Sequence, residues 1–267
     1  GGRAVSAMAF SSDGALLVAA AQDDEHTVHV YNWAEGLLLN RVAGGRSKVL
    51  AFAWSVPGAS VSLLQCGVDH YQVWTLAGRN ISGKKGLYGT VSKRQTFTCC
   101  CWIGNEEAGN IAGVLGAHDG SLYRTDGGRK LADALPLHNG PVTALVAFEP
   151  KAEEGPCVIS AGMDGKIKLL GAELDVKYEF DMRKRDYGAY KWGVSSACLN
   201  ADGRKVLVGT VGSEILELAN DEEAQGDMNQ GPLVVGHCKD ELWGLAVHPT
   251  QEEFCTVGDD KTLRVWG

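Results

Sequence analysis

The sequence lacks any long apolar run, and this absence excludes a membrane-spanning helix. Its longer apolar stretches, such as Leu242–Val247, fall far short of the ~18 residues that such a helix requires. The first ten residues also lack the long apolar region of a secretory signal. We therefore expect a chain that has no membrane partner.

A C-x-x-C pair is also missing, although the chain contains eight cysteines. This absence argues against a disulfide framework and favours reduced thiols in a core, as in a cytoplasmic protein. Three of the cysteines are consecutive, Cys99–Cys101. Because neighbouring side chains in a strand point to opposite faces, these three thiols cannot all bind one metal ion. We expect them to pack in a strand between neighbouring sheets.

An excess of positive charge is absent as well, since the formal net charge is −8. That value argues against a surface that binds nucleic acid as a whole. The phosphate-binding pattern G-x-x-x-x-G-K-S/T does not occur, and the Gly-rich stretch "GNIAGVLGAHDG" lacks its ending. We expect no nucleic-acid partner and no cofactor.

Glycine is abundant, with 35 among 267 residues, which indicates many tight turns. The turns separate six copies of one unit, in which two apolar runs flank a polar turn and a third alternating run follows. Successive units lie 44 to 52 residues apart, close to the ~40–45 residues of a four-stranded propeller blade. The units begin at Val5, Val49, Phe97, Val142, Val194 and Leu242.

This pattern resembles the WD-repeat family. The features that carry the resemblance are Gly236-His237, three turn acids, and the third-strand residues Trp74 and Trp266; the turn acids are Asp119, Asp164 and Asp260. The resemblance implies an all-β, WD-type propeller with six four-stranded blade units, as part of a seven-bladed, tandem propeller. We place the units at about 4–44, 45–93, 94–138, 139–190, 191–237 and 238–267.

Each blade of that family typically holds a hydrogen-bonded set of His, Ser or Thr, Asp and Trp. By position, the last unit matches in full, with His237, Thr256, Asp260 and Trp266. The fourth unit supplies His138, Ser160 and Asp164 but has Leu170 at the Trp position. The set is incomplete in the other units.

A closer resemblance is to the propeller of the echinoderm microtubule-associated protein-like family. It rests on "DELWGLAVHP…DDKTLRVW", "DDEHTVHVYNW", "GLYGTVSKRQTFTCCCW" and "AHDGSLYR". The resemblance implies two tandem propellers in the whole protein, of which this chain is similar to six units of the first. The last unit ends at its third strand, so we expect a segment of a longer chain to supply the missing strand.

The window "GHCKDELWGLAVHP" offers His237, Asp240, Glu241 and His248 as metal ligands. A six-residue strand separates the two histidines, which places them at opposite ends of a blade. We therefore expect His237 to serve its blade, with no metal site and no catalytic residue. A propeller hydrolase would need an acid, base or metal cluster that these residues do not assemble.

Two places are candidates for partner contact. The first is a basic and aromatic stretch that lies in the longest interval between units, 52 residues. It contains Arg183, Lys184, Arg185, Tyr187, Tyr190 and Trp192. The second is Trp243, since tryptophan is frequent at binding hot spots. It follows the first apolar residue of its inner strand, as do Ser6, Leu50, Thr98, Thr143 and Ser195. The roles of loops 175–192 and 219–235 stay open.

The resemblance implies a non-enzymatic scaffold of the cytoskeleton that binds tubulin or microtubules. Microtubule surfaces are acidic, so an acidic chain would need local basic groups for contact; these are Arg183, Lys184, Arg185, Lys84, Lys85, Lys93 and Arg94. The alternative is a general WD-type adaptor, in signalling or in substrate recognition by a ubiquitin ligase, without tubulin contact.

Overall fold

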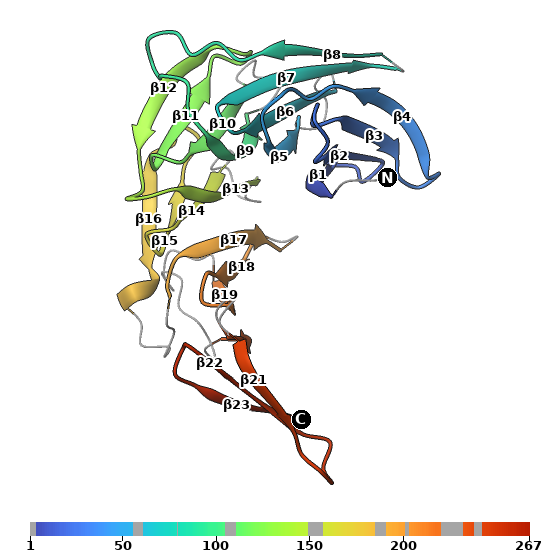
Figure 1. The fold of residues 1–267 in the computed structure, drawn as a ribbon. Coiled ribbons are helices and arrows are strands. Elements are labelled where there is room, and N and C mark those ends of the chain that lie inside the picture. The colour runs from blue at the N-terminus through green and yellow to red at the C-terminus, as the bar shows by residue number, and fades with distance from the viewer. Residues whose placement is uncertain are drawn as a thin grey trace.

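The computed structural model describes residues 4–55, 61–78, 80–104, 111–148, 157–184, 191–200, 203–219, 232–237 and 242–267. Within these residues the chain forms 23 β-strands and one short 3-10 helix, η1 (Met182–Lys184). Sequence neighbours pair antiparallel into six separate sheets (Figure 1). No helix in this part of the chain has the length and apolar character to cross a membrane. The prediction of an all-β propeller fold is confirmed.

The first three sheets have four strands each. Sheet 1 contains β1 (Val5–Phe10), β2 (Leu16–Ala21), β3 (Val28–Asn32) and β4 (Leu37–Val42). Sheet 2 contains β5 (Val49–Trp54), β6 (Ser62–Gly67), β7 (His70–Ala77) and β8 (Asn80–Lys85). Sheet 3 contains β9 (Phe97–Ile103), β10 (Ala112–Ala117), β11 (Ser121–Thr125) and β12 (Leu131–Pro136).

The last three sheets continue the pattern, except that the sixth has three strands among the described residues. Sheet 4 contains β13 (Val142–Phe148), β14 (Cys157–Gly162), β15 (Lys166–Leu170) and β16 (Val176–Asp181). Sheet 5 contains β17 (Val194–Leu199), β18 (Lys205–Thr210), β19 (Glu214–Ala219) and β20 (Val234–Val235). Sheet 6 contains β21 (Leu242–Val247), β22 (Phe254–Gly258) and β23 (Leu263–Trp266).

The inner strands β1, β5, β9, β13, β17 and β21 begin at the six residues where the sequence units begin. In sheets 1 to 5, each inner strand contacts the inner strand of the next sheet, and the sheets follow one another around an arc (Figure 1). Sheets 2, 3 and 4 therefore bury their two faces against two different neighbours.

Four apolar clusters fill the spaces between successive sheets in this arc. The consecutive cysteines show how one strand serves two of them. Cys99 and Cys101 lie in the cluster between sheets 3 and 4, whereas Cys100 lies in the cluster between sheets 2 and 3. The prediction that this strand packs between neighbouring sheets, with its thiols on alternate faces, is confirmed.

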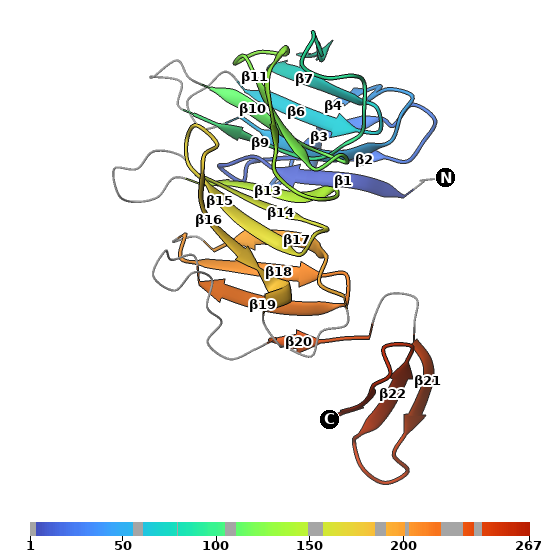
Figure 2. The same ribbon diagram turned by 90° about the vertical axis from the view of Figure 1, so that its left-hand side faces the viewer.

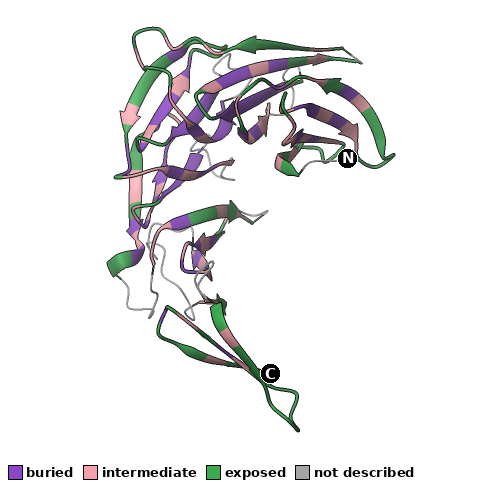
Figure 3. Cartoon of the chain, viewed as in Figure 1, coloured by how far each residue is buried: buried purple, intermediate pink, exposed green. Residues whose placement is uncertain are grey.

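Sheet 6 stands apart from this arc (Figure 2). Its apolar residues are exposed on both faces: Leu245 is 63% exposed on one face, and Leu263 is 65% exposed on the other. In sheet 4 the residues at the matching positions, Leu145 and Ile167, are buried. Figure 3 shows the contrast between the exposed sheet 6 and the more buried sheet 4. Sheet 6 is thus held by its own strand pairing and side-chain hydrogen bonds.

Candidate functional site

Most candidate residues lie on the side of each sheet where its inner strand begins. We call this side the start side. In all six sheets the pairing register slips at the second residue of the inner strand, which forms a β-bulge there. The bulged residues are Ser6, Leu50, Thr98, Thr143, Ser195 and Trp243, the set that the sequence singles out.

Four of these bulged residues carry a hydroxyl group that donates to a carbonyl oxygen of the neighbouring strand. The Ser195 Oγ to Gly209 O distance is 2.9 Å, for example, and Thr143 bonds Ala161 O at 3.1 Å. Ser6 and Thr98 make the same kind of bond. Leu50 and Trp243 cannot, because their side chains carry no hydroxyl group. Trp243 is 70% exposed and therefore offers a large apolar side chain on the start side of sheet 6.

The four residues predicted for the last unit form a continuous hydrogen-bonded chain in sheet 6. The Trp266 indole N–H donates to Thr256 Oγ1 at 2.8 Å, and Thr256 Oγ1 lies 2.7 Å from His237 Nε2. His237 Nδ1 lies 2.9 Å from an oxygen of Asp260. The His237 side chain joins the strands of this sheet at one end, which is a structural role. His248, by contrast, lies in the β21–β22 turn, where its ring nitrogen accepts from two backbone N–H groups.

Sheet 4 has a shorter version of the same chain. His138 Nε2 lies 3.0 Å from Ser160 Oγ, and its Nδ1 lies 3.0 Å from Asp164 Oδ1. This order of Ser, His and Asp is that of a hydrolase triad. Ser160, however, is fully buried within β14, so no substrate can reach its hydroxyl group. The arrangement can support the sheet but cannot perform nucleophilic catalysis in this position.

The ionisation of these groups fits a structural role. Burial lowers the pKa of His138, although Asp164 partly offsets this effect, so the imidazole stays neutral at pH 7. Burial raises the pKa of Asp260, but hydrogen bonds from Arg264, Thr262 and His237 outweigh it and hold this pKa well below its usual range. The carboxylates of Asp164 and Asp260, one in each hydrogen-bonded set, are therefore ionised acceptors at neutral pH.

Sheet 2 replaces the histidine with a buried glutamine, which the sequence reasoning missed. Gln65 Oε1 accepts from the Trp74 indole N–H at 2.9 Å. Its Nε2 donates to Gly44 O at 3.0 Å and to His70 Nε2 at 2.9 Å. The signal in the sequence was Gly44-Gly45, which stands before β5 where Gly236-His237 stands before β21. A long side chain from β6 thus spans the distance that a histidine covers elsewhere.

The predicted basic residues divide into two groups. Lys84, Lys85, Lys93 and Arg94 are exposed at the end of β8 and in the segment after it. Arg183, at η1, donates two hydrogen bonds to the Asp181 carboxylate, at 2.9 and 2.8 Å, so its charge is largely neutralised by a neighbour. Lys184 beside it is exposed.

The remaining residues of that stretch are partly outside the described structure. Arg185, Tyr187 and Tyr190 lie outside it, as do most of loop 219–235 and the acidic pair Asp240 and Glu241. Trp192 is half-buried and packs against the cluster between sheets 4 and 5, where it supports the fold. Its part in a partner contact stays a prediction.

Within the described residues, no group of three or more His, Cys, Asp or Glu side chains could hold a metal ion. Burial raises the pKa of the Cys99 and Cys101 thiols, which makes them poor nucleophiles and poor metal ligands. The consecutive cysteines therefore act as small apolar side chains of the core.

Comparisons with known proteins agree with this architecture. The family model of the WD domain, G-beta repeat, matches residues 1–32 and 231–267. The computationally designed Ika8 protein, whose crystal structure is known, superposes with a TM-score of 0.60 at 19% identity. That match covers 98% of this chain and 70% of the designed chain, and it shows the fold alone.

Among curated proteins, the human echinoderm microtubule-associated protein-like 2 is 30% identical over 99% of this chain and 38% of its own length. The ciliary WD repeat-containing protein ctxp80 of Euplotoides octocarinatus is 27% identical over 100% of this chain and 33% of its own. The chain thus spans less than two fifths of the length of either relative.

Proposed function

We propose that this chain, a WD-repeat β-propeller that resembles the echinoderm microtubule-associated protein-like family, is a non-enzymatic protein-interaction scaffold of the microtubule cytoskeleton. The observation that carries this proposal is the similarity to such a protein over 99% of the chain. The scaffold would act in the cytoplasm and bind tubulin or a microtubule-associated partner through its loops. It would take part in binding without covalent chemistry, as WD repeats serve protein interaction.

Electrostatics supports one contact region for that role. The chain has a net charge of −8, so approach to an acidic microtubule surface needs a local basic surface. We define the basic surface as Lys84, Lys85, Lys93, Arg94, Arg129 and Lys130, from sheets 2 and 3. The segment after β8 is fixed to sheet 3 by a backbone bridge between Leu87 and Lys130. This bridge keeps the charges of both sheets together.

Trp243 supports a second contact. Its side chain is 70% exposed at a bulge, and the β21 residues Leu242 and Leu245 beside it are also exposed. Burial of a tryptophan in a complex removes a large apolar area from water, so this residue is our candidate anchor for a protein partner.

Co-sedimentation with polymerised microtubules tests the proposal. We expect the chain to pellet with microtubules, and we expect less pelleting as salt increases, because exposed charges are screened. Reversal of the basic surface, as Lys84→Glu with Lys93→Glu, should reduce the bound fraction several-fold. Arg41→Glu, on β4 of sheet 1, is the control for each of these two reversals made singly and should pellet normally.

If the parent chain stays in the supernatant at low salt, direct microtubule binding is wrong. A general adaptor role would then be the better account. If the variant Lys84→Glu with Lys93→Glu pellets like the parent chain, the basic surface is not the contact.

We further propose that the ring is completed by chain segments beyond these six units. Exposed apolar residues on sheets 1 and 6, such as Met8 and Leu263, support this idea. In a longer form of the protein, hydrogen exchange in β1 and β23 should be slower than in the present chain. Equal exchange in both forms would contradict it.

A further inference from the structure

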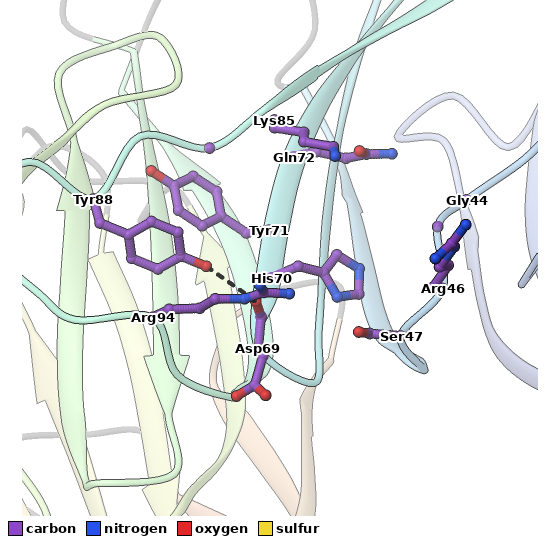
Figure 4. A pocket seen from close by; sticks show the side chains of 12 residues that line it. Gly44, Arg46, Ser47, Asp69, His70, Tyr71, Gln72, Lys85, Tyr88 and Arg94 are labelled. Atoms are coloured by element: carbon purple, nitrogen blue, oxygen red, sulfur yellow. Dashed lines mark hydrogen bonds between the residues drawn. The ribbon is translucent and has the colours of Figure 1, made fainter.

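An open pocket of about 450 Å³ lies on the start side of sheet 2. Three segments line it: residues 44–47 before β5, the β6–β7 turn with the start of β7, and residues 85–94 (Figure 4). Its volume falls within the ~300–1,000 Å³ of typical ligand sites.

The chain before sheet 2 carries two glycines, Gly44 and Gly45, where a histidine precedes sheets 4 and 6, and both glycines line the pocket. Gly44 is required where it stands, since a Cβ there would lie 2.2 Å from the carbonyl oxygen of His26. Gly45 has a φ of +126°, and a Cβ built on it would meet no heavy atom within 4 Å. His237, at the matching position before sheet 6, points into its sheet and bonds Asp260. Without that side chain the space above sheet 2 stays open.

Several polar groups of the pocket wall are already satisfied. Tyr71 donates its hydroxyl to the carbonyl oxygen of Leu87 and shares it with that of Arg129. His70 donates from Nδ1 to Val68 O and accepts at Nε2 from Gln65, and burial lowers its pKa, so the ring is neutral. Tyr71 and His70 are therefore held in place by the protein itself, and other side chains must recognise a ligand.

Three exposed cationic side chains border the pocket: Arg46, Lys85 and Arg94. None of them forms an ion pair with a carboxylate in the described residues. Asp69 is the one acidic residue that lines the pocket, and its carboxylate points away from Arg46 and Ser47 (Figure 4). The pocket therefore has an excess of positive charge in a chain that is acidic overall.

Asp69 orients Arg94 through its backbone. Its carbonyl oxygen accepts from Arg94 Nε at 2.6 Å, which leaves both terminal nitrogens of this guanidinium group for a ligand. The Tyr88 ring forms an apolar wall beside it, held edge-to-face against Tyr71 at 5.4 Å and stacked on Phe97 at 6.1 Å. A fixed ring next to free cations suits a ligand with an apolar stem and an anionic end.

We propose that this pocket binds an acidic peptide segment of a protein partner. A Glu carboxylate of the segment pairs with Arg94 and Arg46, its methylene groups lie on the Tyr88 ring, and Lys85 interacts with a second carboxylate. Arginine binds carboxylates through two parallel hydrogen bonds, which gives such a contact direction as well as strength. Arg46 comes from the first lining segment, and Lys85 and Arg94 come from opposite ends of the third. Among the described residues, the lining includes no helix N-terminus of the kind that holds nucleotide phosphates.

This inference deepens the proposed function and rests on it only in taking the partner to be a protein. The test therefore uses synthetic peptides and no microtubules. Fluorescence polarisation of labelled hexaglutamate is measured with the full chain, with hexaglutamine and a phosphoserine-containing peptide as comparison probes. Retained hexaglutamate binding with no microtubule pelleting would contradict the proposed function alone.

We expect hexaglutamate to bind, hexaglutamine to bind at least ~10-fold more weakly, and affinity to fall as salt increases. The double variant Arg46→Glu with Arg94→Glu should lose ~10-fold or more in affinity. Arg41→Glu, on β4 of sheet 1 and outside the pocket lining, changes the net charge by as much as Arg94→Glu alone. It should stay within ~2-fold of the parent chain, whereas Arg94→Glu alone should weaken binding several-fold.

Three results would overturn the proposal. The first is equal binding of hexaglutamate and hexaglutamine. The second is equal loss in Arg41→Glu and in Arg94→Glu alone, which would reveal a response to net charge only. The third is a phosphoserine peptide that binds much more tightly than hexaglutamate and is lost in the double variant, which would assign the pocket to phosphorylated segments. Unchanged urea midpoints of the variants establish that they fold.

Discussion

Sheets 2 and 4 occupy equivalent places in the repeat but use the start side differently. In sheet 4, His138 fills this place and joins Ser160 to Asp164. In sheet 2, Gly44-Gly45 leaves it open, and Gln65 takes over the internal hydrogen bonds. Of these two sheets, the one with the histidine is closed at this place, whereas the one with two glycines leaves space for a ligand.

Sheet 6 extends this comparison. It has the complete chain of His237, Thr256, Asp260 and Trp266, yet its apolar faces are exposed. Sheet 4 lacks the tryptophan but is buried between two neighbours. The polar chain therefore joins the strands within a blade, while apolar contact between faces places a blade in the ring.

Loss of the central histidine of sheet 4 should have the largest effect. His138→Ala leaves the buried Ser160 hydroxyl without its acceptor, removes one partner of Asp164 and opens a cavity. We expect the free energy of unfolding to fall by about 2–4 kcal/mol. Urea denaturation measures this change. His118→Ala, at an exposed position in the β10–β11 turn, is the control and should change it by less than about 0.5 kcal/mol.

The glutamine that replaces this histidine should matter somewhat less. Gln65→Met keeps the length of the side chain but leaves the Trp74 indole N–H without its acceptor and Gly44 O without its donor. We expect a loss of about 1–3 kcal/mol in the free energy of unfolding. A loss below about 0.5 kcal/mol would mean that Gln65 does not replace the histidine in its supporting role.

The dependence of stability on pH should distinguish sheet 4 from sheet 6, with a smaller effect than the two substitutions above. The pKa of His138 is lowered on folding, so its contribution to stability is complete above about pH 6.5 and decreases as the pH falls below that value. The pKa of Asp260 is also lowered, so its contribution persists until the pH falls below about 3.9. Stability of the parent chain should therefore fall between pH 7 and 5.

The urea midpoint measured across this range tests the assignment. In His138→Ala the slope against pH should be shallower than in the parent chain. His70, whose pKa burial also lowers, should contribute the remaining slope. An identical slope in the variant and the parent chain would contradict the assignment to His138.

The smallest effect on stability is expected at the exposed tryptophan. Trp243→Ser should change the free energy of unfolding by less than about 0.5 kcal/mol, because the side chain is 70% exposed. If Trp243 anchors a partner, the same variant should reduce microtubule pelleting. Normal pelleting would exclude this residue from the contact, whereas a large loss of stability would show that it supports sheet 6.

The strands and the polar chains could be predicted from the sequence because both depend on short-range patterns. Alternation of apolar residues marks each strand, and a fixed spacing marks residues such as Thr256, Asp260 and Trp266. The inner strands begin where the units begin for this reason.

The pocket could not be predicted in the same way. It depends on three segments distant in sequence and on the tyrosine cluster that fixes Tyr88 between sheets 2 and 3. In the sequence, the only trace of the pocket is that no histidine stands shortly before Val49. The separation of sheet 6 was also beyond local reasoning, because burial between sheets is a long-range property.

Hydrogen exchange of the full chain with and without hexaglutamate tests the central claim most directly, namely that the site lies where the repeat is broken. We predict slower exchange at residues 44–47, 69–72 and 85–94 in the presence of the peptide. Residues 138–142 and 160–166 of sheet 4 should exchange at unchanged rates. Equal protection of both sets, or protection of sheet 4 alone, would contradict the account.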